Sequence, residues 1–268
     1  MFLAAVVQLT CTSNQDDNWE MTRCLVERAA EHGARLVATP ENTNFLGHHD
    51  EKVRLAEPLD GPTVSRLREL AAGLGIHVLL GSFNERSDDP RRCYNTSVLI
   101  GPDGQLLGTY RKIHLFDVDL PPELCFAESA TVEPGDTPVV VDCALGRLGL
   151  SICYDLRFPE LYQLLVSQGA NILTVPSAFT LTTGKDHWEP LLRARAIENQ
   201  CYVLAPAQYG KHDDNGLRHS WGHAMIIDPW GSVVAQCSDG PGIAMAEIDL
   251  SRVAEVRRSL PVADHRRL

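Results

Sequence analysis

Short apolar runs of strand length alternate with amphipathic segments of helical length from one end of the chain to the other. Residues 2–9 are apolar except for Gln8, as in a buried strand. Residues 16–32 follow, with Trp19 and Val26 on one face at helical spacing. Gly33 comes directly afterwards, where a glycine commonly ends a helix. Alternation of this kind is typical of α/β proteins, in which helices cover the faces of a sheet.

The rest of the chain continues this pattern. Further strands are predicted at 35–38, 76–80, 94–100, 106–110, 139–141, 148–152, 171–175, 202–205, 224–227, 232–236 and 243–248, and further helices at 64–74, 159–168, 187–199 and 251–259. Glycine- and proline-containing turns at 101–104 and 228–231 predict two hairpins. Because no linker or repeat divides the chain, we expect one domain over 1–268, with residues 264–268 as a surface tail or a segment that docks on a partner subunit.

Composition excludes several classes of function. A net charge of −11 and a pI of about 5.3 argue against a nucleic-acid partner and against docking on anionic membrane. No stretch approaches the roughly 18 apolar residues of a membrane span, and residues 1–8 lack the basic start of a signal peptide. The eight cysteines are scattered, without a C-x-x-C pair, which is typical of reduced thiols. We therefore expect a cytoplasmic protein.

One of these cysteines occupies a position suited to catalysis. The predicted strand 148–152 ends at Cys153, and the next helix is expected near Pro159. At such a strand-to-helix turn a side chain stands clear of the sheet, and the following backbone N–H groups point towards whatever it attacks. Cys153 is therefore a candidate nucleophile, and a buried structural cysteine is the alternative.

Two charged residues also follow predicted strands directly. Glu41 comes after the strand 35–38, where a carboxylate shielded from water can act as an acid and a base. Lys112 comes after the strand 106–110, where an ammonium group can stabilise negative charge on a reacting carbonyl oxygen. Taken singly, a solvated glutamate and a surface lysine remain the alternatives.

Together, the segments Pro40-Glu41-Asn42, Tyr110-Arg111-Lys112 and 152–160 resemble the nitrilase superfamily, the carbon–nitrogen hydrolases. The resemblance implies that Glu41 is the general base and acid, that Lys112 and the Tyr154 backbone N–H bind the oxyanion, and that Cys153 is the nucleophile. It also implies that a second glutamate, Glu128, positions the substrate or the lysine.

The resemblance further implies a four-layer α-β-β-α sandwich, a homodimer or higher homo-oligomer, and a reaction without a cofactor. No metal is expected, because His114, His187 and His223 lack the spacing of metal ligands. The residues expected to bind substrate are Phe179, Thr183, His187 and Arg157. Further cations that could meet substrate carboxylates are Lys185, Lys211 and Arg218.

Residues 176–202, 209–212 and 220–223 are similar to the Nit branch, and more narrowly to its deaminated glutathione amidases. This similarity implies a cysteine-dependent amidase that hydrolyses a linear amide of a 2-oxo acid, deaminated glutathione, through a thioester. An ω-amidase acting on α-ketoglutaramate is the alternative within the branch. Wider alternatives are a nitrilase, an N-carbamoyl amidase and a non-catalytic scaffold that binds a partner.

Overall fold

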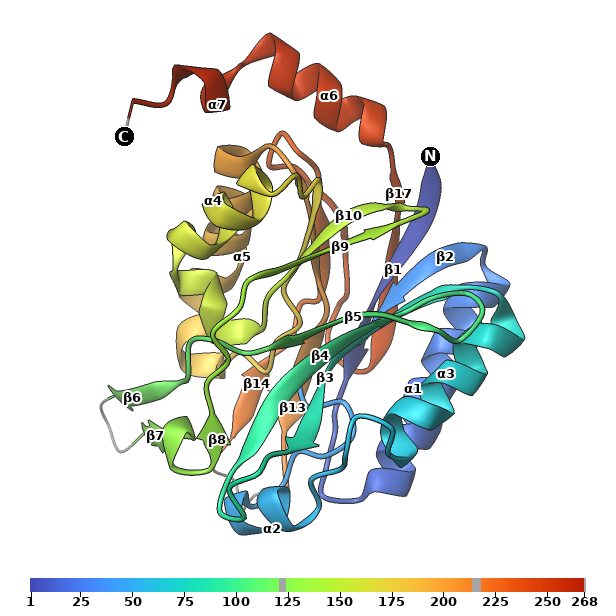
Figure 1. Ribbon diagram of the computed structural model, residues 1–268, viewed down its shortest axis with the longest axis vertical. Coiled ribbons are helices and arrows are strands. Elements are labelled where there is room, and N and C mark those ends of the chain that lie inside the picture. The colour runs from blue at the N-terminus through green and yellow to red at the C-terminus, as the bar shows by residue number, and fades with distance from the viewer. Residues whose placement is uncertain (121–123, 214–217, 268) are drawn as a thin grey trace.

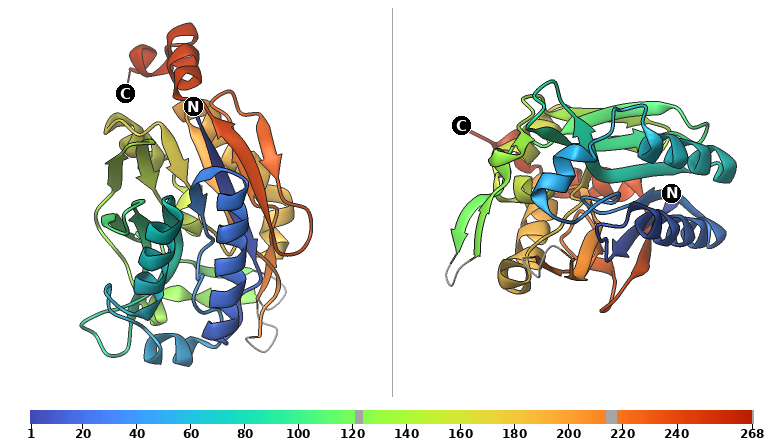
Figure 2. Two further views of the ribbon diagram at one scale, coloured as in Figure 1. Left: turned by 90° about the vertical axis from the view of Figure 1, so that its right-hand side faces the viewer. Right: turned by 90° about the horizontal axis from the view of Figure 1, so that it is seen from below.

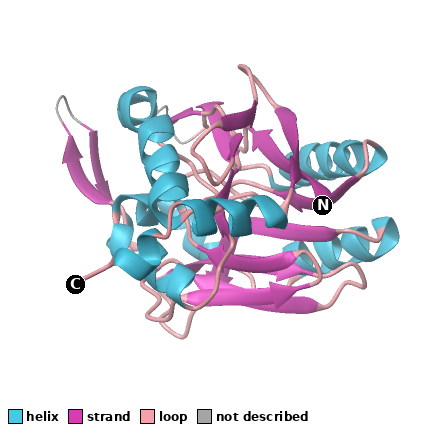
Figure 3. Ribbon diagram, turned by 90° about the horizontal axis from the view of Figure 1, so that it is seen from above, coloured by secondary structure: helices cyan, strands magenta, loops and turns pink. Residues whose placement is uncertain are grey.

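The computed structural model describes residues 1–120, 124–213 and 218–267, and it has four layers. Two β-sheets lie face to face, with helices on the two outer sides (Figures 1 and 2). Seen from above, the strands lie between the helices (Figure 3). The α-β-β-α sandwich expected from the sequence is therefore confirmed.

The first sheet has the strand order β14-β13-β1-β2-β3-β4-β5, with β17 also paired to β1 and β8 to β4. Strands β13, β1, β2 and β3 run parallel, whereas β4, β5, β14 and β17 join antiparallel to their neighbours. The bounds are β1 (Phe2–Leu9), β2 (Ala34–Ala38), β3 (His77–Arg86), β4 (Cys93–Ile100), β5 (Leu106–Arg111), β8 (Val132–Glu133), β13 (Ala207–Lys211), β14 (His219–Trp221) and β17 (Gly242–Ile248).

The second sheet has the order β16-β15-β12-β11-β10-β9, with β10, β11 and β12 parallel. Its strands are β9 (Val139–Cys143), β10 (Gly146–Leu150), β11 (Ile172–Thr174), β12 (Tyr202–Ala205), β15 (Met225–Ile227) and β16 (Val233–Gln236). A separate antiparallel pair, β6 (Asp117–Leu120) and β7 (Leu124–Ala127), projects to one side (Figure 1).

Helices α1 (Gln15–Glu31) and α3 (Pro62–Leu74) cover the first sheet, and α4 (Pro159–Ser167) and α5 (Leu181–Asn199) cover the second (Figure 1). Strand β1 shows how this arrangement uses the sequence. Its Val7 belongs to the cluster under α1 and α3, while its Val6 belongs to the cluster between the sheets. A strand buried on both faces is almost continuously apolar, and β1 is so except for Gln8.

The remaining elements are short or terminal: α2 (His49–Arg54), α6 (Leu250–Ser259), α7 (Val262–His265) and the 3-10 turns η1 (Glu128–Ala130) and η2 (Cys153–Arg157). The sequence predictions missed α2, α7, β6, β7, β8, β13 and β14, which are mostly too short to show a period. The start of the helix predicted at 187–199 was wrong, since α5 begins at Leu181. The expected tail at 264–268 begins inside α7, whose residues are exposed.

Candidate active site

Cys153 lies where the second sheet meets α4. After β10 the chain turns sharply, and Cys153 adopts a left-handed backbone conformation with φ of 47°. Such a conformation costs a side-chain-bearing residue about 1–3 kcal/mol and is often found at functional sites. It is held by a 2.9 Å hydrogen bond from the Cys153 N–H to the Pro176 carbonyl. The 3-10 turn η2 follows directly, so that Tyr154 presents its backbone next to the thiol.

Glu41 reaches the same place from the end of β2 in the first sheet. Its carboxylate is 3% exposed, and each oxygen has a fixed donor. The Ala178 N–H lies 2.8 Å from Oε2, and the Asn95 side-chain amide lies 2.8 Å from Oε1. A carboxylate held from both sides in this way has a single orientation in the site.

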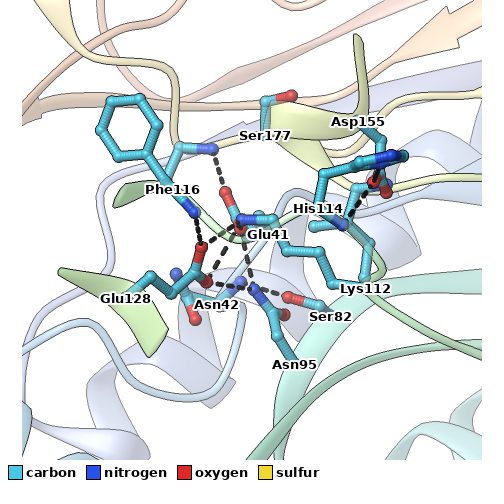
Figure 4. A network of polar contacts seen from close by, with 12 residues as sticks. Glu41, Asn42, Ser82, Asn95, Lys112, His114, Phe116, Glu128, Asp155 and Ser177 are labelled. Carbon is cyan, nitrogen blue, oxygen red and sulfur yellow. Dashed lines mark hydrogen bonds and ion pairs between the residues drawn. The ribbon is translucent and has the colours of Figure 1, made fainter. Parts of the chain in front are cut away.

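Lys112 follows β5 and is 2% exposed. Its Nζ lies 3.0 Å from Oε1 of Glu41 and 2.9 Å from Oε2 of Glu128. Figure 4 shows the three side chains pointing towards one another. Burial acts to lower the Lys112 pKa, but the two carboxylates together raise it well above its usual range. Lys112 is therefore a permanent ammonium group.

Glu128 balances this charge. Burial acts to raise its pKa, but Lys112 and Lys52 lower it to about 2, and the Phe116 N–H donates a 2.7 Å hydrogen bond to it. Since Glu128 stays ionised, its negative charge balances the positive charge of Lys112 even when Glu41 is protonated. The arrangement leaves Glu41 available for proton transfer.

The Cys153 thiol has the opposite tendency. Burial and the nearby Glu41 carboxylate raise the pKa of this thiol well above its usual range, while Lys112 acts in the other direction. The resting enzyme therefore holds a neutral thiol at pH 7. Nucleophilic attack then requires a base that removes the thiol proton as the new bond forms.

These residues line one pocket, which encloses about 700 Å³ of space between atoms, open solvent included. Of the residues predicted from the sequence, the pocket brings together Glu41, Lys112, Glu128, Cys153, Tyr154, Arg157, Phe179, Thr183 and Arg218.

His187 is the exception among the residues expected to bind substrate. It lies on α5 outside the lining of the pocket, and its Nδ1 is 3.3 Å from Nη1 of Arg157. Arg157 itself lies over the rings of Phe179 and Tyr154, with its Cζ atom 5.2 and 5.9 Å from the two ring centroids. His187 therefore contacts a lining residue and does not itself face the pocket. Lys185 and Lys211 also lie outside the lining, and both are exposed.

Asp155, two residues before Arg157, has partners of its own in the structure. Its fully buried carboxylate accepts hydrogen bonds from the Tyr110 hydroxyl, the Ile152 N–H and the His114 N–H, at 2.7, 2.8 and 3.1 Å. Asp155 thus joins η2 to the segment that carries Lys112, and Arg157 stays directed to the pocket.

Two residues of the site were missed at the level of sequence. Asn95 on β4 donates to both Glu41 and Glu128, at 2.8 and 3.3 Å. The signal available was an asparagine inside a buried strand, where this residue is rare. Lys52 on α2 lines the pocket and is 7% exposed. Its short helix gave no periodic pattern that could have drawn attention to it.

Comparison with known proteins identifies the class that this fold and site define. The carbon–nitrogen hydrolase family model matches residues 3–258, and the chain belongs to this family. A deaminated glutathione amidase from Synechocystis sp. is 47% identical over 268 residues, which cover 99% of this chain and 98% of that protein. The resemblance to the Nit branch, and the expectation of an enzyme that hydrolyses carbon–nitrogen bonds, are thereby confirmed.

Two solved structures support the same assignment. The Caenorhabditis elegans NitFhit protein has a TM-score of 0.93 and 44% identity over 99% of this chain, which spans 65% of that chain. An amidase from Nesterenkonia sp., with acrylamide added to its active-site cysteine, has a TM-score of 0.80 and 26% identity over 97% of this chain and 98% of its own.

Two further kinds of feature are absent from the described residues. No group of three or more His, Cys, Asp or Glu side chains in this part of the chain could hold a metal ion. Within the same residues, no helix is long and apolar enough to cross a bilayer.

Proposed function

We propose that the protein is a cysteine-dependent amidase, in a single carbon–nitrogen hydrolase domain, that hydrolyses deaminated glutathione through a thioester. The observation that carries the proposal is the convergence of Glu41, Lys112 and Cys153 on one buried pocket from three distant segments. The substrate class is supported by the similarity to deaminated glutathione amidases over almost the whole chain.

In the first half of the reaction, Glu41 takes the proton from the Cys153 thiol as its sulfur attacks the amide carbon. The charge that develops on the carbonyl oxygen is met by the Lys112 ammonium and the Tyr154 N–H. Protonated Glu41 then gives its proton to the nitrogen, the C–N bond breaks and the amine leaves. A thioester on Cys153 remains.

In the second half, Glu41 removes a proton from a water molecule, which attacks the thioester carbon. The oxyanion is stabilised by the same two donors, and the C–S bond breaks. The proton returns from Glu41 to the sulfur, so that the acid product and the resting thiol are formed. Arg157 is suited to bind the carboxylate of the 2-oxo acid, because its guanidinium faces the pocket beside two aromatic rings.

Steady-state kinetics on deaminated glutathione, α-ketoglutaramate, a nitrile and an N-carbamoyl amino acid test this proposal. We expect kcat/KM to be highest for deaminated glutathione, and a Cys153→Ala variant to lose at least about a thousandfold. Higher kcat/KM on α-ketoglutaramate would assign the chain to the ω-amidases instead. A folded Cys153→Ala variant with full activity would contradict the mechanism. Alkylation of the wild type gives a second test: if Cys153 reacts no faster than the other seven cysteines, a non-catalytic scaffold is favoured.

We also propose a cytoplasmic homodimer. The location is supported by the eight cysteines, all within the described residues and all free thiols. Self-association is supported by large apolar side chains that are half exposed: Ile197, Trp230 and Leu260. Light scattering after size-exclusion chromatography tests the dimer, and a single peak at the mass of one chain would contradict it.

A further inference from the structure

Lys52 is a buried cation in the pocket that the reaction above does not use. It lies on α2 (His49–Arg54), lines the pocket and is 7% exposed. Its ammonium forms no hydrogen bond or ion pair with any residue in the described ranges. Burying a charge without a partner costs free energy, and such a side chain facing a pocket points to a ligand of opposite charge.

Glu128 is the carboxylate whose pKa Lys52 helps to lower, but it is not an ion-pair partner within contact distance. Its two oxygens already accept from Lys112, Asn95 and the Phe116 N–H. The charge at this carboxylate is therefore satisfied without Lys52. What Lys52 adds is positive potential in the pocket that it lines.

Besides Lys112, which faces Glu41 and Glu128, and Arg218, the pocket is lined by one more cation, Arg157, which enters from a different part of the fold. Arg157 belongs to η2, directly before α4, whereas Lys52 lies on α2. Figure 1 shows α2 at the bottom of the molecule and α4 on its upper left side. Two cations that reach one pocket from separate elements suit a substrate with two separated anionic groups.

We propose that Lys52 binds a carboxylate on the amine half of the substrate, the half that leaves when the thioester forms. The inference rests on the proposed amidase function and assigns the site a specificity. Deaminated glutathione has one carboxylate on its 2-oxo acid half and another at the glycine end of its leaving group. α-Ketoglutaramate has only the first and releases ammonia, so Lys52 separates these two substrates.

The test compares wild type with Lys52→Met, using both substrates. We expect Lys52→Met to raise KM for deaminated glutathione about tenfold or more, since a hydrogen bond to a charged group is lost. Its kcat/KM for α-ketoglutaramate should stay within about twofold of wild type. Arg54→Met is the matched control, because Arg54 is a cation on the same helix, is exposed and contacts Glu51. Lys52→Arg should keep the preference.

A modified substrate makes the test specific to the carboxylate. Converting the terminal carboxylate of deaminated glutathione to an amide should raise the KM of wild type by about the same factor as the Lys52→Met substitution does. The same conversion should not raise the KM of the Lys52→Met variant any further. If Lys52→Met does not fold, equal wild-type kinetics on acid and amide would still overturn the inference.

The remaining outcomes are also decisive. Equal losses on deaminated glutathione and α-ketoglutaramate would mean that Lys52 acts only through Glu128, and unchanged kinetics on both would mean that it binds neither. In each case the proposed function survives and the inference fails. A wild-type enzyme that hydrolyses neither substrate would remove the proposed function, and the inference with it.

Discussion

The hydroxyl of Tyr110 lies 2.7 Å from Oδ2 of Asp155 and joins the end of β5 to the turn η2, which begins at Cys153. Lys112 stands two residues after Tyr110, and Cys153 two residues before Asp155. Burial, together with the Asp155 carboxylate, raises the pKa of Tyr110 well above its usual range, so its hydroxyl stays a donor. This bond therefore sets the position of Lys112, the proposed oxyanion residue, relative to the Cys153 sulfur.

Replacing Tyr110 with phenylalanine should lower kcat about tenfold and leave KM nearly unchanged, because the bond positions the catalytic groups and does not contact substrate. The free energy of unfolding should fall by about 1–3 kcal/mol, since the buried Asp155 loses a donor. Kinetics and urea unfolding measure both effects. Tyr162→Phe is the control, because it removes a buried hydroxyl that lies 2.8 Å from Ser151. Equal loss of kcat in the two variants would contradict the positioning role.

Replacing Glu128 with glutamine should lower kcat about a hundredfold. The amide keeps the size of the side chain but removes the charge that balances Lys112, which then pairs with Glu41 alone. Single-turnover measurements of thioester formation should show the loss in this step. Glu133→Gln is a suitable control, since Glu133 contacts Ser87 and Tyr94 outside the pocket. Full activity of Glu128→Gln would show that the lysine needs no second carboxylate.

Replacing Glu41 with glutamine should make the Cys153 thiol easier to ionise and should nevertheless slow amide hydrolysis. Burial is the first cause of the raised Cys153 pKa and the Glu41 carboxylate is the next, so the variant thiol should ionise at lower pH than in wild type. Amide hydrolysis should nevertheless fall about a thousandfold, because the base is gone. Thiolate absorbance, measured against Cys153→Ala to remove the other cysteines, follows the ionisation. If the pH midpoint of thiol ionisation rises in the variant, the Glu41 carboxylate does not raise the Cys153 pKa, and the prediction is contradicted.

Stability should decrease at alkaline pH. Burial raises the pKa of Cys11 to about 12, and of Cys201 and Cys237 to about 11, from a usual 9.0. The unfolded chain loses these protons first, so the stabilisation is complete below about pH 9 and is lost as the pH rises above it. Each thiol adds a slope of about 1.4 kcal/mol per pH unit.

Urea unfolding at about pH 7.5 and at about pH 10 measures this slope. Cys237→Ala should be less stable at both values because it leaves a cavity, yet its slope should be smaller by one thiol. A slope unchanged by the substitution would show that Cys237 does not contribute.

Replacing Gly81 with alanine should abolish folding or destabilise the protein by more than about 3 kcal/mol. A Cβ atom at this position of β3 would lie 1.9 Å from the Thr39 carbonyl oxygen, in the backbone that leads to Glu41. Gly73→Ala is the control. Its Cβ would have nothing within 4 Å, and in α3 it should stabilise by about 0.5–1 kcal/mol. Thermal and urea unfolding compare the two, and similar behaviour would show that β3 can move away.

Much of the fold was visible in the sequence, because long elements carry a strong period. Strand β1 is buried on both faces and is apolar except for Gln8, and α1 ends at Glu31, two residues before Gly33, which has φ of 90°. The short strands β13 and β14 were missed, since three to five residues do not show a period. The start of α5 was misplaced because Gly184 and Pro190, which are weak helix formers, lie in its first half.

The sequence by itself determined the family, and it predicted Glu41, Lys112 and Cys153 as the catalytic residues, since each follows a predicted strand in the order typical of that family. Only the tertiary structure decided which other groups meet them. Asn95 and Lys52 enter the site from β4 and α2, and His187 stays outside it. The physical reason is that packing between segments distant in sequence determines which residues become neighbours across two stacked sheets. The local sequence pattern indicates only the periodicity of a single segment.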